Sequence, residues 1–186
     1  MTVVPVLETE RLLLRGWRYE DLQQWAALCA DDEVMRWLGY DGGIGAGEAW
    51  NEMAGLAGHW LLKGFGHWVL EERESGALVG RAGVLFPPDW PALELGWTVA
   101  RPRWGEGFAG EAARAAAAWA QEELGADHLI SLIAPENARS IRVAEKLGMT
   151  EEGATRLRGF ELTIYGSDLP LRGCGSGAAG RGTRPA

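Results

Sequence analysis

A glycine-rich turn placed directly ahead of a long alanine-rich segment constrains this chain more than any other feature. Gly105, Gly107 and Gly110 stand just before and within the start of a helical pattern that runs to Leu124. Glycines permit a tight turn and a close approach of the backbone to a ligand. The first turn of a helix presents free N–H groups and the positive end of the helix dipole. The stretch therefore predicts an anion-binding loop that leads straight into a helix.

The same glycines spell G-x-G-x-x-G, the pattern that binds dinucleotides in Rossmann folds. That interpretation needs a strand immediately before the first glycine and an acidic residue about twenty positions after the motif. Here residues 100–104 separate the strand-like run 93–99 from Gly105, and Ile130 occupies the position where the acid is required. An NAD-dependent oxidoreductase is therefore the weakest alternative for this chain.

A second motif follows about thirty residues downstream. Residues 135–149 combine a loop proline, Asn137 at a position suited to cap a helix, an amphipathic segment, and Gly148 where that helix would end. Together the two segments resemble the GNAT acetyltransferase superfamily, in particular its branch of ribosomal-protein amino-terminal acetyltransferases. In that family motif A, Q/R-x-x-G-x-G/A, cradles the pyrophosphate of acetyl-CoA, and motif B reads N-x-x-S-x-x-x-x-x-K-L-G-F/M.

The resemblance carries over residue by residue. Motif A places Trp104 at the Q/R position, a departure that this branch tends to show, with Gly107 at the glycine and Ala109 at the last small residue. Motif B matches at Asn137, Ser140, Lys146, Leu147, Gly148 and Met149. Because residues 7–15 also look like the first strand of that branch, the resemblance covers residues 7–165. It implies a set of cofactor-binding residues: Trp97, Val99, Trp104, Gly105, Gly107, Phe108, Ala109 and Asn137.

The reaction that the family implies is direct attack of an amine on the thioester of acetyl-CoA. Backbone N–H groups near 97–99 are suited to the developing oxyanion. A general base must also take a proton from the amine. Glu94 is our first candidate, since strand alternation separates it from Leu93 and Leu95; the alternative is a carboxylate on a solvated face or in an ion pair. Asp89, His67 and Glu161 stand in reserve.

Family members frequently use a tyrosine in the motif B helix as the acid for the departing thiolate. The corresponding position here is Ala144, so Ser140 is the substitute to test. A hydroxyl one turn into a helix also bonds locally, which is the structural alternative for Ser140. Asn137 likewise has two possible roles. It can cap the helix, and the resemblance also places it near the pantetheine arm of the cofactor.

Composition favours one domain. The 186 residues, 47% of them hydrophobic, suffice for one core, which we expect over residues 1–171. Glycine, alanine, serine and arginine prevail in residues 172–186, which predicts a flexible Gly-rich tail. Neither a signal peptide nor an apolar run of membrane-spanning length is evident, so we expect a cytoplasmic protein that does not bind membranes.

The net charge and the cysteine content limit which molecules this protein is expected to bind. A net charge of −8 disfavours nucleic acid and favours a cationic acceptor. Cys29 and Cys174 have neither metal-ligand nor redox spacing, so we expect reduced thiols and no metal. The acceptor is then an amine, either on a small molecule or at a protein amino terminus. The sequence leaves open a homodimer.

The order of elements predicts an α/β (α+β) fold with a GNAT-like mixed, mainly antiparallel central sheet flanked by helices. Trp37, Trp50 and Trp60 fall in helical segments on the expected acceptor side, with core packing as the alternative. The expected strands are 11–17, 67–71, 78–86, 93–99, 129–133, 151–158 and 160–165, and the expected helical segments are 21–29, 33–38, 48–62, 108–124 and the motif B helix.

We therefore expect an N-acetyltransferase that uses acetyl-CoA. The alternative from a different class is a module that binds acyl-CoA without turnover, because the tyrosine expected at position 144 is missing.

Overall fold

The computed structural model of the chain describes residues 3–171, in which a single eight-stranded sheet forms the centre. The order across the sheet is β1-β2-β3-β4-β5-β6-β8-β7, and every neighbouring pair is antiparallel except β5 and β6. The expected mixed, mainly antiparallel sheet is confirmed, and it is not the doubly wound parallel sheet of a Rossmann fold. The strands are β1 (Leu7–Glu8), β2 (Leu12–Arg15), β3 (His67–Glu72), β4 (Leu78–Leu85), β5 (Glu94–Val99), β6 (His128–Ile133), β7 (Thr150–Leu157) and β8 (Phe160–Asp168).

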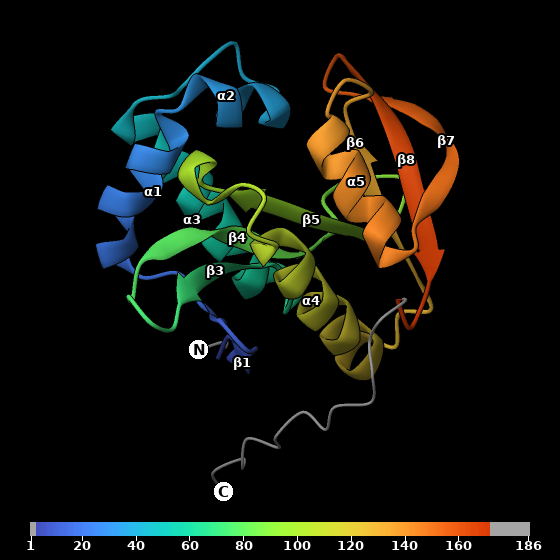
Figure 1. Ribbon diagram of the computed structural model, residues 1–186, viewed down its shortest axis with the longest axis horizontal. Coiled ribbons are helices and arrows are strands. Elements are labelled where there is room, and N and C mark those ends of the chain that lie inside the picture. The colour runs from blue at the N-terminus through green and yellow to red at the C-terminus, as the bar shows by residue number, and fades with distance from the viewer. Residues whose placement is uncertain (1–2, 172–186) are drawn as a thin grey trace, which may run out of the picture.

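Helices cover both faces of this sheet (Figure 1). The helices α4 and α5 lie on one face, where the alanines of α4 pack against β2, β4 and β5 in the main core. On the other face α1 and α3 enclose a second apolar cluster around Trp25 and Val69. The helical segments are η1 (Tyr19–Asp21), α1 (Leu22–Cys29), α2 (Asp32–Met35), η2 (Arg36–Leu38), α3 (Ala46–Lys63), η3 (Arg101–Arg103), α4 (Phe108–Leu124) and α5 (Ala138–Leu147).

The amino-terminal segment is a hairpin rather than the single strand expected over residues 7–15 and 11–17. Leu7 pairs with Leu14, and Glu8 pairs with Leu13. The chain reverses because Thr9 closes the turn: its backbone N–H donates to the Leu12 carbonyl at 2.9 Å, and its hydroxyl oxygen accepts from the Leu12 N–H at 2.9 Å. A hydroxyl side chain thus replaces the strand ladder at this position.

A buried ion pair fixes the end of β2. The Arg15 guanidinium donates to both carboxylate oxygens of Asp21, at 2.6 and 2.8 Å, and its Nε donates to Glu71 at 2.6 Å. The side chains of Arg15 and Asp21 are only 6% and 5% exposed. The hydrogen bond with Asp21 raises the pKa of Arg15. This contact ties β2 to the start of α1 and to β3.

The two middle strands of the sheet separate soon after they meet. The parallel pair β5 and β6 has Glu94 opposite Ile130 as its register pair, supported by the Ile130 N–H donating to the Leu93 carbonyl at 3.1 Å. Beyond this point β5 stays paired with β4 alone, while β6 stays paired with β8. The separation leaves one side of residues 96–99 without a neighbouring strand.

The described part of the chain ends inside the core. Leu171 is 2% exposed and packs in the main cluster, so the expected domain end lies at a buried residue. The expected tail, residues 172–186, and Cys174 lie outside the described residues. Within residues 3–171, no helix combines the length and the apolar composition that crossing a bilayer requires.

Candidate functional site

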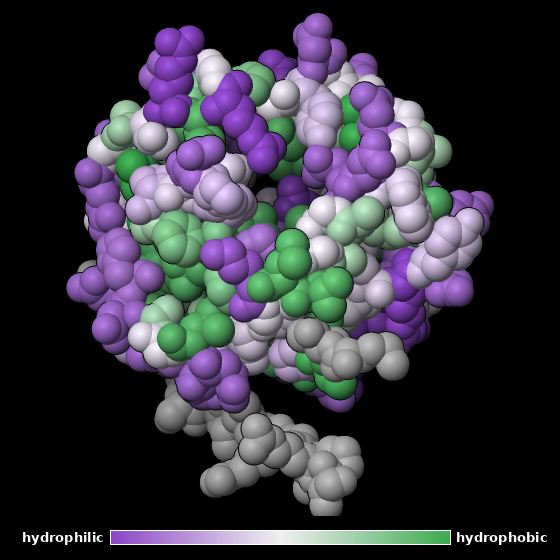
Figure 2. Space-filling view, turned by 180° about the vertical axis from the view of Figure 1, so that it is seen from behind, coloured by the Kyte–Doolittle hydropathy of each residue, from purple (hydrophilic) through white to green (hydrophobic). Residues whose placement is uncertain are grey.

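A cleft of about 1900 Å³ occupies the space where β5 and β6 separate. From behind, the surface is hollowed near its centre, and hydrophilic residues border the hollow (Figure 2). The cleft is lined by η2, β5, the loop before α4, the start of α5 and the turn between β7 and β8. Most of the candidate residues therefore share one opening.

The predicted anion-binding loop lies at one end of this cleft. Gly105 and Gly107 have φ of +85° and +90°, a left-handed backbone that favours glycine, and Gly107 caps α4. Among the described residues, the N–H groups of 105–110 donate no hydrogen bond, whereas the Glu111 N–H bonds to the Gly107 carbonyl at 3.1 Å. These free donors and the dipole of a seventeen-residue helix make a site suited to phosphate.

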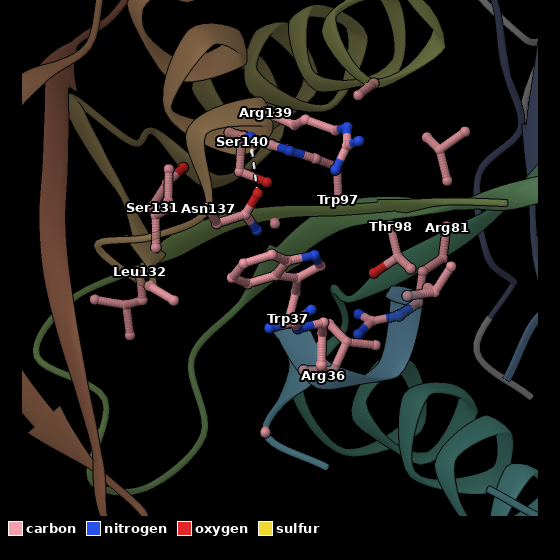
Figure 3. A pocket seen from close by; sticks show the side chains of 18 of the residues that line it. Arg36, Trp37, Arg81, Trp97, Thr98, Ser131, Leu132, Asn137, Arg139 and Ser140 are labelled. Carbon is pink, nitrogen blue, oxygen red and sulfur yellow. Dashed lines mark hydrogen bonds between the residues drawn. The ribbon is translucent and has the colours of Figure 1, made fainter. Parts of the chain in front are cut away.

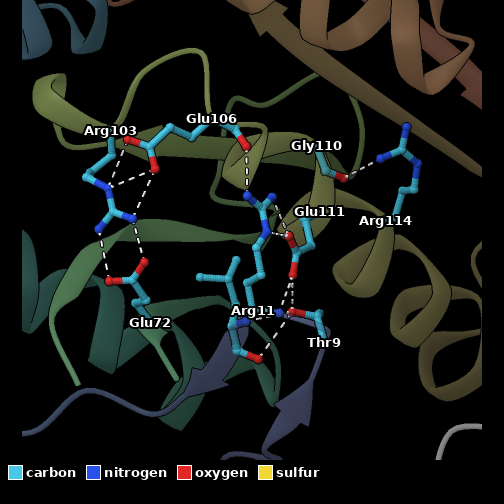
Figure 4. A network of polar contacts seen from close by, with 9 residues as sticks. Thr9, Arg11, Glu72, Arg103, Glu106, Gly110, Glu111 and Arg114 are labelled. Carbon is cyan, nitrogen blue, oxygen red and sulfur yellow. Dashed lines mark hydrogen bonds and ion pairs between the residues drawn. The ribbon is translucent and has the colours of Figure 1, made fainter. Parts of the chain in front are cut away.

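A network of charged side chains holds this loop in place (Figure 4). Glu111 of α4 accepts hydrogen bonds from Thr9 at 2.6 Å and from the backbone and side chain of Arg11 at 2.9 and 2.7 Å. Arg11 also donates to the Glu106 carbonyl at 2.9 Å. Arg103 pairs with Glu72 of β3, and that hydrogen bond lowers the pKa of Glu72 to about 2. The loop is therefore fastened to the β1–β2 hairpin and to β3.

Backbone groups of β5 face the cleft in a regular pattern. The Leu95 carbonyl accepts from the Ser131 hydroxyl at 2.7 Å, and the Val99 carbonyl accepts from Trp104 Nε1 at 2.7 Å. Both carbonyls thus point away from β4. Because alternate residues of an antiparallel strand direct their backbone groups to the same side, Trp97 presents its N–H and carbonyl there too. Trp97, Val99 and Trp104 all line the cleft.

The motif B helix contributes capping and positive charge. Asn137 caps α5 by accepting the Ser140 N–H at 3.1 Å, which confirms the predicted cap. Asn137 and Ser140 both line the cleft and lie beside each other in Figure 3. The basic side chains of Arg139, Arg142 and Lys146 border the same end of the cleft, and Arg139 lies over the Trp104 ring at 4.5 Å. Ala144, by contrast, is fully buried in the core.

Glu94 lies where β5 and β6 separate. Its carboxylate accepts the indole N–H of Trp90 at 2.5 Å. Burial raises the pKa of Glu94, and the Trp90 hydrogen bond, the charge of Arg81 and the Leu132 backbone offset only part of that rise. A carboxylate in such surroundings holds a proton more readily than one in water.

Two residues next to Glu94 form a buried polar pair. His67 of β3 and Arg81 of β4 are 1% and 8% exposed, and Arg81 Nη1 lies 2.5 Å from His67 Nδ1. A guanidinium can only donate, so Nδ1 accepts and Nε2 carries the hydrogen of the neutral ring. Burial and the charge of Arg81 hold the pKa of His67 well below its usual value. His67 is thus poorly suited to act as the reserve base.

The other reserve residues lie farther from this pair. Asp89 is exposed and does not line the cleft, while Glu161 borders it with a 72% exposed side chain that pairs with Arg156 at 3.5 Å. Of the three tryptophans singled out, Trp37 lines the cleft. Trp60 is core, 2% exposed, and Trp50 is 42% exposed against Tyr19.

Sequence reasoning missed Arg81. The signal was present, because Arg81 is the one charged residue in the strand Leu78–Leu85, which is otherwise apolar or glycine. A buried strand rarely carries an arginine without a partner.

Cys29 is buried and free, and burial raises the pKa of its thiol to about 12. Within residues 3–171 no group of three or more histidine, cysteine, aspartate or glutamate side chains is arranged to hold a metal ion.

Comparison with known proteins adds a family to this geometry. The family model described as "Acetyltransferase (GNAT) domain" matches residues 11–150. YkkB of Bacillus subtilis, an uncharacterized protein, is 35% identical over 107 residues, which are 55% of this chain and 62% of YkkB. The chain thus spans less than two thirds of that relative.

Solved structures share the fold. An acetyltransferase from Agrobacterium tumefaciens superposes with a TM-score of 0.78 at 30% identity, covering 88% of this chain and 94% of the other. A protein from Vibrio cholerae, proposed to be a ribosomal-protein-serine acetyltransferase, gives a TM-score of 0.75 at 20% identity and covers 90% and 99%. The second likeness bears on the fold alone.

Proposed function

The chain belongs to the GNAT acetyltransferase family, and from that premise we propose that it transfers an acetyl group from acetyl-CoA to an amine by direct attack. One observation carries the proposal: a row of free N–H groups at the start of α4 and a half-buried carboxylate, Glu94, whose pKa is raised by desolvation, border the same cleft. The first suits the phosphates of a nucleotide cosubstrate, and the second suits proton transfer from an amine.

The residues present fit acetyl-CoA. The N–H groups of 105–110 would hold its pyrophosphate, assisted by the positive charge of Arg139, Arg142 and Lys146. The backbone N–H and carbonyl of Trp97 and the N–H of Val99 would hold the extended pantetheine arm, and Phe108, Ala109 and Asn137 line the same cleft. Acetyl-CoA supplies the acetyl group as a thioester, whose C–S bond breaks as the amine nitrogen bonds to the acetyl carbon.

Glu94 acts as the general base in this proposal. Its carboxylate takes a proton from the acceptor ammonium, directly or through one water, and passes it to solvent, so that the nitrogen lone pair is free to attack. A raised pKa suits the task, because a base works best when its pKa approaches the working pH. Backbone N–H groups near Trp97 polarise the carbonyl as its oxygen gains charge.

The departing sulfur needs a proton, which the attacking nitrogen releases as the amide forms. Ser140 lines the cleft one turn into α5 and is the one hydroxyl side chain in residues 135–149, so we assign it the relay of this proton. Ala144 leaves the usual tyrosine position filled by a buried methyl group.

The test is release of free CoA thiol that depends on an added amine. Thiol release that requires the amine supports the proposal. Stabilisation by CoA without turnover for any amine would instead indicate a module that only binds acyl-CoA. Stabilisation by NAD but not by CoA would instead indicate that the glycine motif binds a dinucleotide and that the protein is an oxidoreductase.

The phosphate-binding role of the loop predicts a specific loss in Gly107→Ala. A Cβ at this position would stand in the way of the pyrophosphate and would strain the left-handed backbone. We expect CoA affinity to fall on the order of tenfold or more, measured by calorimetric titration and by the thermal shift. Gly125→Ala is the matched control, because Gly125 caps the other end of α4 with φ of +64°. Both variants should lose about 1–2 kcal/mol of stability from strain. Equal CoA affinity in the two variants would contradict the loop assignment.

The hydrogen bond between Trp90 and Glu94 predicts a shift of the pH profile. Trp90→Phe removes a donor that stabilises the carboxylate, so the pKa of Glu94 should rise further. Because the carboxylate is the active form, the acidic limb of kcat against pH should move to higher pH. Trp50→Phe, at an exposed site outside the cleft, should leave this limb in place. An unmoved limb in Trp90→Phe would show that Glu94 does not set it.

A further inference from the structure

Unpaired hydrogen-bond donors gather on the floor of the cleft. His67 Nε2, Arg81 Nε and Thr98 Oγ1 are buried without a partner, and so is the indole nitrogen of Trp37. All four residues line the cleft. One more unpaired donor is close at hand: the buried indole nitrogen of Trp25, whose ring centroid lies 5.9 Å from the Arg81 guanidinium carbon. Leaving buried donors unpaired is costly, so this group is built for an occupant that accepts.

These donors come from one face of the sheet. Arg81 of β4 is opposite Thr98 of β5, and His67 of β3 is opposite Gly83 of β4, two residues from Arg81. Side chains two residues apart on a strand share a face. Figure 3 shows Arg81 and Thr98 projecting together into the space that Trp37 borders. The arrangement is thus a cluster, not separate defects.

Arg81 lacks a counter-ion. Its nearest polar partner is the neutral His67 ring, and no carboxylate of the described residues pairs with it within 4.0 Å. Glu52 and Glu94 act on it only at longer range, and Glu52 is itself engaged by the Tyr40 hydroxyl at 2.5 Å. An arginine stays charged when buried and is strongly stabilised by a carboxylate.

Glu94 lies beside His67, on the side of this cluster away from Arg81. A Cβ built on Gly96 would stand 3.1 Å from His67 Nε2 and 3.9 Å from Glu94 Oε1, so the missing side chain leaves both atoms beside one gap. The carboxylate of Glu94, the neutral ring of His67 and the guanidinium of Arg81 therefore follow one another along the cleft floor. This order complements a molecule with an ammonium at one end and a carboxylate at the other.

We propose that the acceptor is a small amine that also carries a carboxylate, bound with its carboxylate at Arg81, His67 and Thr98 and its amine at Glu94. This inference rests on the proposed function and selects between its two acceptor classes. A protein amino terminus has an amide where an amino acid has a carboxylate, so it leaves Arg81 without a counter-ion.

The experiment compares acceptors that differ only at the carboxylate. A panel of α-, β- and ω-amino acids is assayed against the matching primary amides, with thiol release giving kcat/KM. The wild type should prefer at least one carboxylate over its amide by about 10- to 100-fold, the scale of one charge-assisted hydrogen bond. Equal or better use of the amides, plain amines or amino-terminal peptides would overturn the inference while leaving amine acetylation intact.

Arg81→Met tests the assigned residue. Replacing an unpaired buried cation by an apolar side chain should not lower the melting temperature, so the variant remains measurable. It should lose the preference for the carboxylate over the amide. The ratio of the two kcat/KM values is measured above the acidic limb of the pH profile, because loss of the Arg81 charge also raises the pKa of Glu94. Arg73→Met removes the same charge from an exposed site outside the cleft and should keep the preference. A preference that survives in Arg81→Met would overturn the assignment.

A binding measurement separates this inference from the proposed function. With CoA present, N-acetylated amino acids should raise the melting temperature of the wild type more than their amides do, and this difference should vanish in Arg81→Met. If no amine is turned over, the proposed function fails and this measurement alone decides the inference. Absence of any difference between acids and amides would then overturn it.

Discussion

Glu94→Gln is expected to lower kcat by about 10²- to 10⁴-fold while CoA affinity stays near that of the wild type. The amide has the shape of the carboxylate and still accepts the hydrogen bond from Trp90, but it cannot take a proton from an amine at neutral pH. The defect should shrink as the pH rises toward the pKa of the acceptor, where the free amine is abundant without help. Steady-state kinetics from pH 6 to 10 provide the measurement.

Stability separates loss of the base from damage to the fold. The folded-state pKa of Glu94 is raised by burial, so the folded protein binds more protons than the unfolded chain between the two pKa values. Stability therefore falls as the pH rises through that window, and ionised Glu94 is destabilising above it. Glu94→Gln removes this cost and should unfold at an equal or higher temperature at pH 7. Glu161→Gln, an exposed carboxylate at the border of the cleft, is the control. Activity within a fewfold of the wild type in Glu94→Gln would reject Glu94 as the base.

Asp21→Asn should produce the second large effect, a loss of about 3 kcal/mol in the free energy of unfolding. The substitution keeps the shape of the side chain but leaves the buried Arg15 guanidinium with Glu71 as its only carboxylate. Removal of one partner from a buried ion pair leaves the other charge incompletely compensated, here by Glu71 alone. Because Glu71 remains, the value lies at the lower end for such pairs. Chemical denaturation monitored by tryptophan fluorescence measures it.

An exposed ion pair gives the control. Glu33→Gln breaks a pair with Arg36 at 3.0 Å, in which both side chains are more than 40% exposed, and should change stability by at most about 1 kcal/mol. Similar small losses in both variants would mean that Glu71 alone satisfies Arg15.

Local patterns explain what the sequence could predict. The Ala-rich segment 108–124 matches α4 residue for residue, because propensity, the capping glycines and the core pattern agree there. Asn137 and Gly148 likewise mark the ends of α5 by short-range geometry, with a capping side chain at one end and φ of +86° at the other.

What the sequence could not predict depends on contacts distant along the chain. Residues 7–15 read as one strand because the reversal depends on the Thr9 side chain and on Glu111, 100 residues away from Arg11. His67, Arg81 and Thr98 on the cleft floor come from three different strands. Their positions relative to one another are set by strand pairing rather than by a local sequence pattern. The sequence marks Arg81 as the one charged residue of its strand, but its lack of a carboxylate partner can be seen only once the neighbouring side chains are placed.

The contacts that hold the phosphate-binding loop determine whether its sequence motif could function in another protein. Residues 100–113 contain every glycine of the motif, yet the backbone that they adopt is held by Thr9 and Arg11 of the turn between β1 and β2 and by Glu72 of β3. A peptide of residues 100–113 would keep the motif sequence but would not adopt the phosphate-binding conformation, since a short helix start is unstable by itself. Recognition of the anion thus belongs to the assembled domain, and grafting the motif would require transplanting the amino-terminal hairpin with it.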